Sequence, residues 1–226
     1  METLQDSSFF REKRAASLPT PAQIRALNEG KGRNGGSPSF DWPPPVKIEA
    51  LGLFVKYGTR VTVTEGQTQV WIREKLRGRV DVPEVFGWAR DGRSIHKQPS
   101  TDIYFTLNEQ VIGPFQGEDA VEQFQDALGI EVANPGPAVF THNDLVACNI
   151  LVRKNSSNLA AIIDFGQAGW YPAYWEYCKA RRIGVPDKRF HDYEEEWRRE
   201  YLPKIMSPVD EVKVWYQFVR FAISRV

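Results

Sequence analysis

The feature that most constrains this chain is a pair of short apolar segments with a polar turn between them and polar residues at both outer ends. Residues 150–152 (Ile-Leu-Val) and 159–163 (Leu-Ala-Ala-Ile-Ile) are apolar, and the sequence Asn-Ser-Ser-Asn (155–158) lies between them. Apolar segments of this length around a turn of Asn and Ser predict a β-hairpin. Asn149 directly precedes the first segment and Asp164 directly follows the second. Because a hairpin brings its two ends together, we expect Asn149 and Asp164 to lie side by side.

The same region carries polar residues at the spacing of a kinase catalytic loop. That loop has the pattern His-x-Asp, four further residues and then Asn, which His142, Asp144 and Asn149 fit without a gap. The Asp-Phe-Gly triplet at 164–166 matches the metal-binding motif that follows such a loop. Asp and Asn are also common in ordinary loops. The presence of both patterns at the two ends of one hairpin favours the kinase-type loop over this alternative.

These residue types suit phosphoryl transfer for a chemical reason. The transition state spreads negative charge over the transferred group, so catalysis consists mostly of positioning and of stabilisation by cations. We expect Asp144 to accept or orient the proton of the attacking hydroxyl, and Asn149 and Asp164 to bind magnesium. Mg²⁺ prefers oxygen ligands and only one or two carboxylates.

Composition excludes several other classes of protein. The 226 residues are 42% hydrophobic and 26% charged, with a formal net charge of 0, so we expect neither a nucleic-acid nor a membrane partner. No apolar segment approaches the roughly 20 residues of a membrane-spanning helix, and no signal peptide is predicted. The two cysteines, Cys148 and Cys178, do not make a secreted disulfide framework. We therefore expect a cytoplasmic protein.

A second chemical feature is a lysine at the end of an apolar segment. Lys56 follows Leu-Phe-Val at 53–55, where a charge is costly unless the ammonium group reaches water or an anion. A helix is predicted from Thr64, with Gln67 as the second residue of a capping box and Glu65 in the first turn. In kinases such a lysine contacts the nucleotide phosphates and pairs with a glutamate of the next helix. The alternatives are a lysine that reaches solvent and a glutamate that favours the helix dipole.

Along the chain, composition suggests an N-terminal extension and two folded parts. Residues 1–45 are predicted to be an extension or linker that is partly disordered. Residues 1–20 are polar and expected to be frayed or disordered, and a glycine-rich stretch follows a short helix from Thr20-Pro21. Residues 46–98 are predicted to form a small lobe and residues 99–226 a large lobe. Further helices are expected within residues 118–128, 172–183, 187–201 and from 207 onward.

Four blocks of the sequence resemble, in the same order, the aminoglycoside phosphotransferase family, which includes choline kinase-like relatives. They are residues 51–58 (LGLFVKYG), 82–88 (VPEVFGW), 140–144 (FTHND) and 163–176 (IDFGQAGWYPAYWE). The resemblance implies an α+β fold of the bilobal protein-kinase-like type, with a small β-rich lobe containing one helix and a mainly helical large lobe. It also implies ATP- and Mg-dependent transfer of a phosphoryl group to a small-molecule hydroxyl.

The resemblance implies a role for each matched residue. Asp144 would be the base and His142 would brace the loop through hydrogen bonds. Asn149 and Asp164 would be the metal ligands. Lys56 would contact phosphate, and Glu65 would support it. The family motif does not specify which alcohol is the acceptor.

One segment departs from the family pattern. After Trp88-Ala-Arg-Asp-Gly the family continues with an apolar strand and a hinge, whereas residues 93–99 are polar and end in a proline. The stretch from Gly92 to Phe140 is also shorter than a strand, a hinge and several helices require. The sequence therefore predicts a family member with an internal deletion around residues 93–99. The alternative function is that of a catalytically inactive, truncated or pseudokinase-like protein with a binding role.

Two further sets of residues leave alternatives open. The tryptophans at 170, 175, 197 and 215 either pack in the core or line an acceptor pocket. The Glu-Glu-Glu run at 194–196 either faces solvent on a helix or binds a cationic acceptor.

Overall fold

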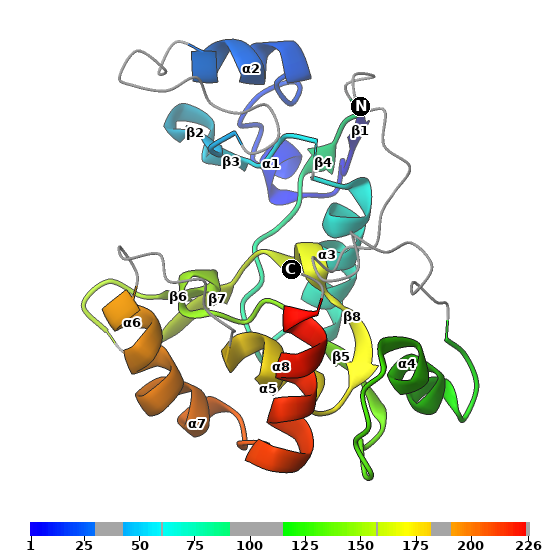
Figure 1. Ribbon diagram of the computed structural model, residues 1–226. Helices are drawn as coiled ribbons and strands as arrows, with labels where there is room; N and C mark the ends of the chain where they lie inside the picture. The colour runs from blue at the N-terminus through cyan, green and yellow to red at the C-terminus, as the bar shows by residue number, and fades with distance from the viewer. Residues whose placement is uncertain (30–42, 60, 91–114, 157, 182–190, 225–226) are drawn as a thin grey trace. The chain divides into compact units, whose positions relative to one another are not determined.

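The computed structural model describes residues 1–29, 43–59, 61–90, 115–156, 158–181 and 191–224. The chain divides into two compact units, Met1–Gln98 and Pro99–Val226, which are described separately below. Helices and short antiparallel strands occur in both units, so the α+β class predicted from the sequence is confirmed (Figure 1). The predicted internal deletion, with its missing hinge, lies outside the described residues.

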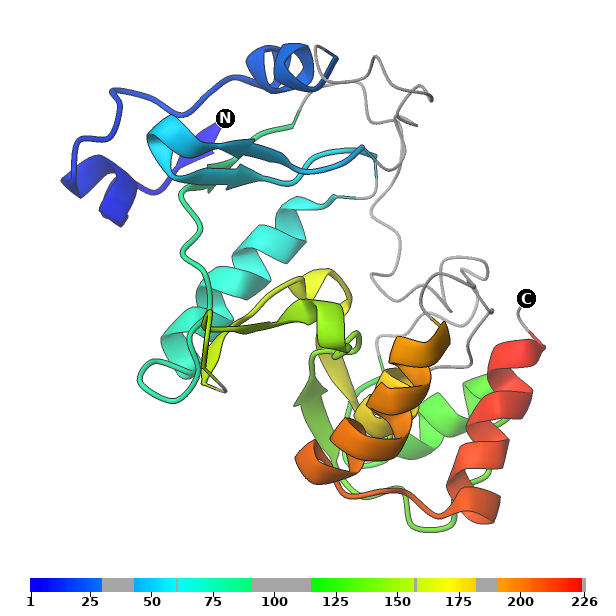
Figure 2. The ribbon, with the colours of Figure 1, turned by 90° about the vertical axis from the view of Figure 1, so that its left-hand side faces the viewer.

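The first unit contains two pairs of antiparallel strands. Strand β2 (Val46–Ile48) pairs with β3 (Leu53–Val55), as Figure 2 shows, and β1 (Glu2–Thr3) pairs with β4 (Gly87–Trp88). The turn between β2 and β3 is a short 3₁₀ segment that ends at Gly52, whose φ of 60° lies in the left-handed region. Glycine adopts this conformation without steric cost, which explains why the predicted turn forms there.

Three helices accompany these strands: α1 (Ser8–Arg11), α2 (Pro21–Glu29) and α3 (Val63–Lys75). Helix α2 begins as the sequence predicts, because the Thr20 hydroxyl accepts the backbone N–H of Gln23 at 3.3 Å and Gln23 in turn accepts the backbone N–H of Thr20 at 2.8 Å. Helix α3 begins earlier than predicted. Its N-cap is Thr62, which accepts the backbone N–H of Glu65 at 3.1 Å, so the expected start at Thr64 with Gln67 is wrong.

The expectation that residues 1–20 are disordered is also wrong. Phe9 is completely buried and its ring packs against Phe86 at 5.6 Å, while the backbone N–H of Leu4 donates to the Phe86 carbonyl at 2.9 Å. The average composition of residues 1–20 is polar, but the burial of the Phe9 side chain stabilises this segment by about 2 kcal/mol. Residues 30–42 of the predicted linker lie outside the described residues.

The second unit places one hairpin inside another pair of strands. Strand β5 (Ala138–Thr141) pairs with β8 (Gly169–Pro172), and the hairpin of β6 (Ile150–Val152) and β7 (Leu159–Ile162) lies between them in the sequence. Two loops therefore begin and end at these strands. The first connects β5 to β6 and contains Asp144, and the second connects β7 to β8 and contains Asp164. We call them the first loop and the second loop.

Helices surround this strand arrangement. They are α4 (Ala120–Leu128), α5 (Trp175–Arg181), α6 (His191–Glu196), α7 (Leu202–Ile205) and α8 (Tyr216–Ile223), with π-helical segments at Trp197–Tyr201 and Glu211–Trp215. The helical segment expected from residue 207 onward begins at a cap by Asp210, whose carboxylate accepts the backbone N–H of Val212 at 3.0 Å and of Lys213 at 2.8 Å.

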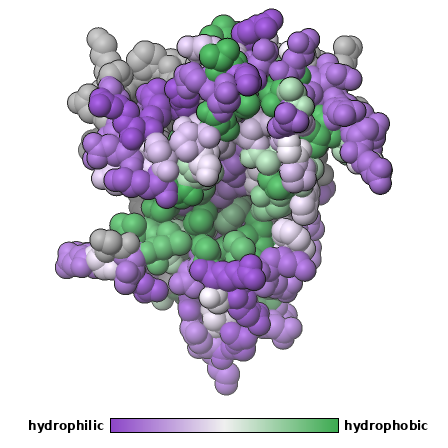
Figure 3. All heavy atoms as spheres, turned by 90° about the horizontal axis from the view of Figure 1, so that it is seen from below, coloured by the Kyte–Doolittle hydropathy of each residue, from purple (hydrophilic) through white to green (hydrophobic). Residues whose placement is uncertain are grey.

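The core of the second unit is centred on Trp175 of α5. Its side chain is completely buried, stacks on Tyr171 of β8 at 5.7 Å and meets Phe124 of α4 edge-on at 5.0 Å and Phe218 of α8 at 5.1 Å. Three elements thus converge on one indole ring, which fixes α5 directly beneath the strands that carry the two loops. Apolar side chains also remain at the surface, and Figure 3 shows hydrophobic residues exposed between hydrophilic ones.

Candidate active site

The hairpin predicted from the sequence is present and brings its two ends together. Ile150 pairs with Ile162, and the backbone N–H of Ile163 donates to the carbonyl of Asn149 at 3.0 Å. The first and second loops therefore meet at the base of the hairpin. Asn149 supplies the acceptor of this last hydrogen bond, and Asp164 directly follows its donor, Ile163.

Asn149 also fixes Asp144. A 3₁₀ turn, Ala147–Asn149, folds the chain back so that the Asn149 Nδ2 donates to the backbone carbonyl of Asp144 at 2.8 Å and to its carboxylate Oδ2 at 3.2 Å. Because the Asn149 amide nitrogen donates these two bonds, the Oδ1 atom of Asn149 is the acceptor end of the same side chain. An oxygen of this kind is the ligand that a hard cation requires. The four-residue spacing between Asp144 and Asn149 is what makes this turn possible.

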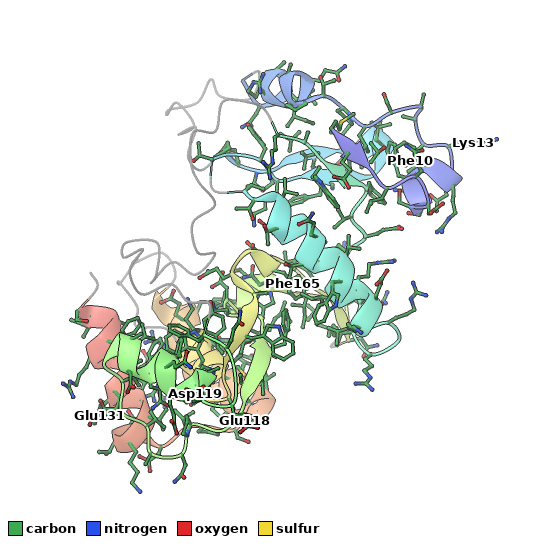
Figure 4. All side chains as sticks on the ribbon, turned by 90° about the vertical axis from the view of Figure 1, so that its right-hand side faces the viewer. Phe10, Lys13, Glu118, Asp119, Glu131 and Phe165 are labelled. Atoms are coloured by element: carbon green, nitrogen blue, oxygen red, sulfur yellow. The ribbon has the colours of Figure 1, made fainter. Side chains whose placement is uncertain are left out.

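Asp164 has an unusual backbone conformation. Its φ is 66°, in the left-handed region, and Asn143 of the first loop has a φ of 64°. Asn and Asp tolerate this region better than other non-glycine residues, at a cost of about 1 kcal/mol each. Phe165, labelled in Figure 4, then turns inward and is 4% exposed. The centroid of its ring lies 4.7 Å from that of His142. Its burial pins the second loop against the first.

His142 contacts the second loop through Nε2 and braces its own loop through Nδ1. Nε2 lies 2.8 Å from the carbonyl of Ile163, and Nδ1 accepts the backbone N–H of Asp144 at 3.3 Å. A neutral imidazole with its proton on Nε2 satisfies both contacts, since Nε2 then donates to the carbonyl. This geometry is that of a bracing residue rather than of one that transfers protons.

Sequence reasoning missed the residues beneath the loops. The Glu176 carboxylate of α5 accepts the backbone N–H of Asn143 at 3.0 Å and also that of His142. The Asn143 side chain donates to the carbonyl of Gln167 at 2.9 Å and accepts the indole N–H of Trp175 at 2.9 Å. These contacts join positions more than twenty residues apart, so they cannot be predicted from the local spacing of residues.

Charge beneath the loops is balanced. Burial raises the pKa of Glu176 above its ordinary value, while the backbone donors of Asn143, His142 and Leu145 and the nearby charge of Lys179 oppose that shift. Lys179 is 6% exposed and donates from Nζ to the Gln167 Oε1 at 3.1 Å. A buried ammonium with a fixed acceptor and a nearby carboxylate avoids the cost of an isolated charge.

Most of the aromatic residues considered for an acceptor pocket belong to the core. Trp175, Trp197 and Trp215 are at most 8% exposed, which favours the core alternative. Trp170 on β8 differs, being 66% exposed and packed edge-on against Phe140 at 5.8 Å.

The acidic run on α6 has partners within its own helix and the turn that follows. Glu194 and Glu195 pair with Arg198 and Arg199 at 3.9 and 3.4 Å, and Glu196 accepts the Tyr201 hydroxyl at 3.2 Å. These contacts favour the solvent-facing alternative over a site for a cationic acceptor.

In the first unit, Lys56 and Glu65 form an ion pair. The Lys56 Nζ lies 2.8 Å from the Glu65 Oε1, and the side chains are 37% and 11% exposed. Because Thr62 caps the backbone of Glu65, the carboxylate is held at the first turn of α3, and the Lys56 side chain stays partly exposed. The expected partnership is present in the structure, and a contact of Lys56 with phosphate stays a prediction.

The donor set suits magnesium better than a transition metal. Within the described ranges, no group of three or more His, Cys, Asp or Glu side chains is gathered to hold a metal ion. Magnesium is usually held by one or two carboxylates, with amide or water oxygens and substrate phosphates completing its shell. Asn149 and Asp164 fit that requirement. No helix in the described part of the chain is long and apolar enough to cross a membrane.

Comparison with known proteins agrees with the geometry of the second unit. The family described as "Phosphotransferase enzyme family" matches residues 104–210, a segment that includes both loops and α5. No curated protein and no solved structure matches the chain. Over residues 104–210, just under half of its length, the chain is therefore similar to the phosphotransferase enzyme family.

Proposed function

We propose that this chain is an ATP- and Mg-dependent phosphotransferase that acts on the hydroxyl of a small molecule. The observation that carries the proposal is the junction of the two loops. The Asn149 side chain holds the Asp144 carboxylate at 3.2 Å, and the hairpin returns Asp164 to the position next to the Asn149 backbone contact. A carboxylate for the alcohol and two oxygen donors for a cation are thus carried by two loops that meet at the base of the hairpin.

In this proposal Asp144 orients the attacking hydroxyl and accepts its proton. The Asp144 backbone is fixed through the Asn149 Nδ2 and through Nδ1 of His142. Fixing the acceptor matters because a base must lie within hydrogen-bond reach of the proton that it takes. The match to the phosphotransferase enzyme family over residues 104–210 supports this assignment, since such loops position the acceptor alcohol.

Asn149 and Asp164 would hold magnesium, which would neutralise charge on the ATP phosphates. Lys56 would contact those phosphates, and Glu65 would keep its ammonium group in place through the 2.8 Å ion pair. A bilobal protein-kinase-like arrangement, which would bring such a lysine to the two loops, is part of the proposal.

The proposed acceptor is a small alcohol, and the proposed location is the cytoplasm. A formal net charge of 0 supports the absence of a nucleic-acid or membrane partner, because neither polyanion would be attracted at long range. The alternative is a catalytically inactive, pseudokinase-like chain that binds a partner. The polar sequence at residues 93–99, where the family has the adenine-binding hinge, is the observation that favours it.

A thermal-shift experiment with Mg-ATP separates these two functions. Ligand at 100 times its Kd stabilises by about 2.7 kcal/mol, and for a chain of this size each kcal/mol raises Tm by about 2–4 °C, so a shift of about 5–10 °C is expected. Asp164→Ala should abolish this shift, whereas Asp126→Ala, an exposed carboxylate on α4, should leave it unchanged.

Transfer is then measured with labelled ATP and a panel of small alcohols. Asp144→Asn should retain the shift with Mg-ATP and lose about 10²–10⁴-fold in transfer rate. A chain that shows no shift at all supports the inactive alternative. A shift that survives Asp164→Ala contradicts the assignment of the metal ligand.

A further inference from the structure

We propose that the N-terminal segment, residues 2–14, is a strap that positions helix α3 and, through Glu65, the ammonium group of Lys56. The contacts run from the strap to residues 82–88, and from these residues to α3. Trp88 is the positioning residue that joins the two steps. The inference rests on the proposed function, in which Lys56 contacts the ATP phosphates, and deepens it.

The first step is a strand pairing that requires glycine. Strand β1 of the strap pairs with β4, and Thr3 lies opposite Gly87 (Figure 1). The two backbones approach so closely at Gly87 that a Cβ atom there would lie 2.5 Å from the Glu2 carbonyl oxygen. Atoms at that distance overlap, so a side chain at position 87 would push the strap away from β4.

The rest of the strap is anchored on the residues that precede β4. The Phe9 ring is completely buried, and its centroid lies 5.6 Å from that of Phe86. The backbone N–H of Ser8 donates to the Glu84 Oε1 at 3.1 Å. The Arg14 guanidinium lies 5.6 Å from the centroid of the Phe86 ring, at the distance of a cation–π contact. The strap is therefore held along its length and not only at β1.

The second step connects residues 82–88 to one side of α3. Gln69 donates from Nε2 to the Pro83 carbonyl at 2.9 Å, and Arg73 donates from Nε to the carbonyl of the residue before Pro83 at 3.1 Å. Positions 66, 69 and 73 are three and four residues apart, so they lie on the same side of the helix. Residues 82–88 therefore follow this side of α3.

Trp88 makes the contact nearest the start of α3. Its ring lies against Gly66, where a Cβ atom would come within 3.3 Å of the Trp88 Cε3. Its indole N–H donates to the Glu2 Oε2 at 2.9 Å, so the strap holds the ring in this orientation. Glu65, next to Gly66 along the chain, pairs with Lys56 at 2.8 Å. A shift of the first turn of α3 would therefore move the carboxylate away from the ammonium group.

A role in positioning differs from a role in stability in its dependence on Lys56. If the strap acts by positioning Lys56, its release weakens Mg-ATP binding only while residue 56 is a lysine. A segment that only stabilises the unit would lower the folded fraction whichever residue occupies position 56. A double-mutant cycle measures this difference, because coupled sites give effects that do not add.

The test releases the strap in the full chain in two ways. Gly87→Ala displaces β1 through the overlap with the Glu2 carbonyl, and Glu2→Ala removes the acceptor of the Trp88 indole. Glu2→Gln retains an oxygen that can accept the same bond, so it serves as the conservative rescue. Glu49→Ala is the matched control, because this glutamate of the same unit is 81% exposed and pairs with Lys47 at 3.1 Å.

Mg-ATP affinity is measured by calorimetry, for each variant with Lys56 and with Lys56→Met, at a temperature where circular dichroism shows all variants folded. Gly87→Ala should weaken binding by about tenfold, as expected of Lys56→Met itself, and Glu2→Ala by about threefold. In the Lys56→Met chain neither should weaken binding by more than about twofold further. Glu2→Gln and Glu49→Ala should stay within about twofold of the unsubstituted chain.

Hydrogen exchange without nucleotide reads the hold on α3 directly. Exchange at residues 65–70 should rise by about tenfold in Gly87→Ala and by about threefold in Glu2→Ala, and should be unaltered in Glu2→Gln and Glu49→Ala. If Gly87→Ala does not fold, the Glu2 variants decide the matter, since Glu2 lies at the surface.

Three results would overturn the inference: unchanged exchange at residues 65–70 in the strap variants, an equal loss of affinity with and without Lys56, or a Glu2→Gln chain that behaves like Glu2→Ala. If the unsubstituted chain binds no Mg-ATP, the proposed function fails. The exchange pattern then still decides whether the strap holds α3.

Discussion

Replacement of Trp175 by phenylalanine is expected to destabilise the second unit strongly, because it removes a buried hydrogen bond together with packing. The indole N–H donates to Asn143 at 2.9 Å, and both side chains are completely buried. Phenylalanine would leave the Asn143 Oδ1 without this donor, which costs about 1–3 kcal/mol. The lost ring volume adds about 1–2 kcal/mol, less than the full cost of truncating a buried aromatic residue.

The sum is about 3 kcal/mol, a large part of the 5–15 kcal/mol that ordinarily separates folded from unfolded protein. At about 2–4 °C per kcal/mol, the Tm should fall by about 6–12 °C. Urea unfolding followed by far-ultraviolet circular dichroism measures the change without depending on tryptophan fluorescence.

Trp215→Phe provides the matched control. Trp215 is 8% exposed and packs on Phe218 at 5.9 Å and under Arg181 at 4.1 Å, and among the described residues the structure gives its indole no hydrogen bond. The control should therefore lose only the packing contribution of about 1–2 kcal/mol. If Trp175→Phe costs no more than Trp215→Phe, the hydrogen bond to Asn143 does not contribute and the reasoning is refuted.

Three further predictions concern reactivity, pH and nucleotide binding. Cys148 is exposed, whereas burial raises the pKa of Cys178 to about 12, so at pH 8 a disulfide reagent should titrate one thiol in the native chain and two in denaturant; two fast thiols would contradict the burial of Cys178. Burial raises the pKa of Glu176 above its ordinary 4.5, so its contribution to stability is full below pH 4.5 and is lost as the pH rises through the folded value. The stability gap between the unsubstituted chain and Glu176→Gln, measured by urea unfolding, should therefore narrow from pH 4.5 to 8, and a widening gap would be inconsistent with this sign. Lys56→Met should weaken Mg-ATP binding in calorimetry by about tenfold or more, as expected for loss of a charge-assisted phosphate contact, whereas Lys47→Met, an exposed strand lysine, should not; equal effects would remove the special role of Lys56.

Local patterns were sufficient for elements whose cause lies within a few residues. The β6–β7 hairpin follows from apolar segments around Asn and Ser, and the start of α2 follows from the Thr20–Gln23 box. The start of α3 was missed by two residues because two overlapping cap patterns, at Thr62 and Thr64, compete. The pattern with Glu at its third helical position is the one that forms.

Features that depend on distant residues could not be predicted in the same way. Phe9 packs against Phe86, which lies far along the chain, so composition alone suggested disorder. Glu176 was visible within a family-like block, but its bonds to the first loop join residues separated by 33 or 34 positions. Charge, burial and partner are properties of the folded chain, whereas spacing is a property of the sequence.

The nesting of the β6–β7 hairpin within the β5–β8 pair has a consequence for biosynthesis. A ribosome delivers the hairpin complete before it delivers either strand β8 or the glutamate of α5, so both motif-bearing loops leave the exit tunnel without the groups that hold them. The two kinase-like motifs are thus translated before strand β8 and helix α5, which hold the two loops in place. A gene prediction that stops between these two points would retain the His-x-Asp-x4-Asn and Asp-Phe-Gly motifs and encode a polypeptide whose two loops lack their support.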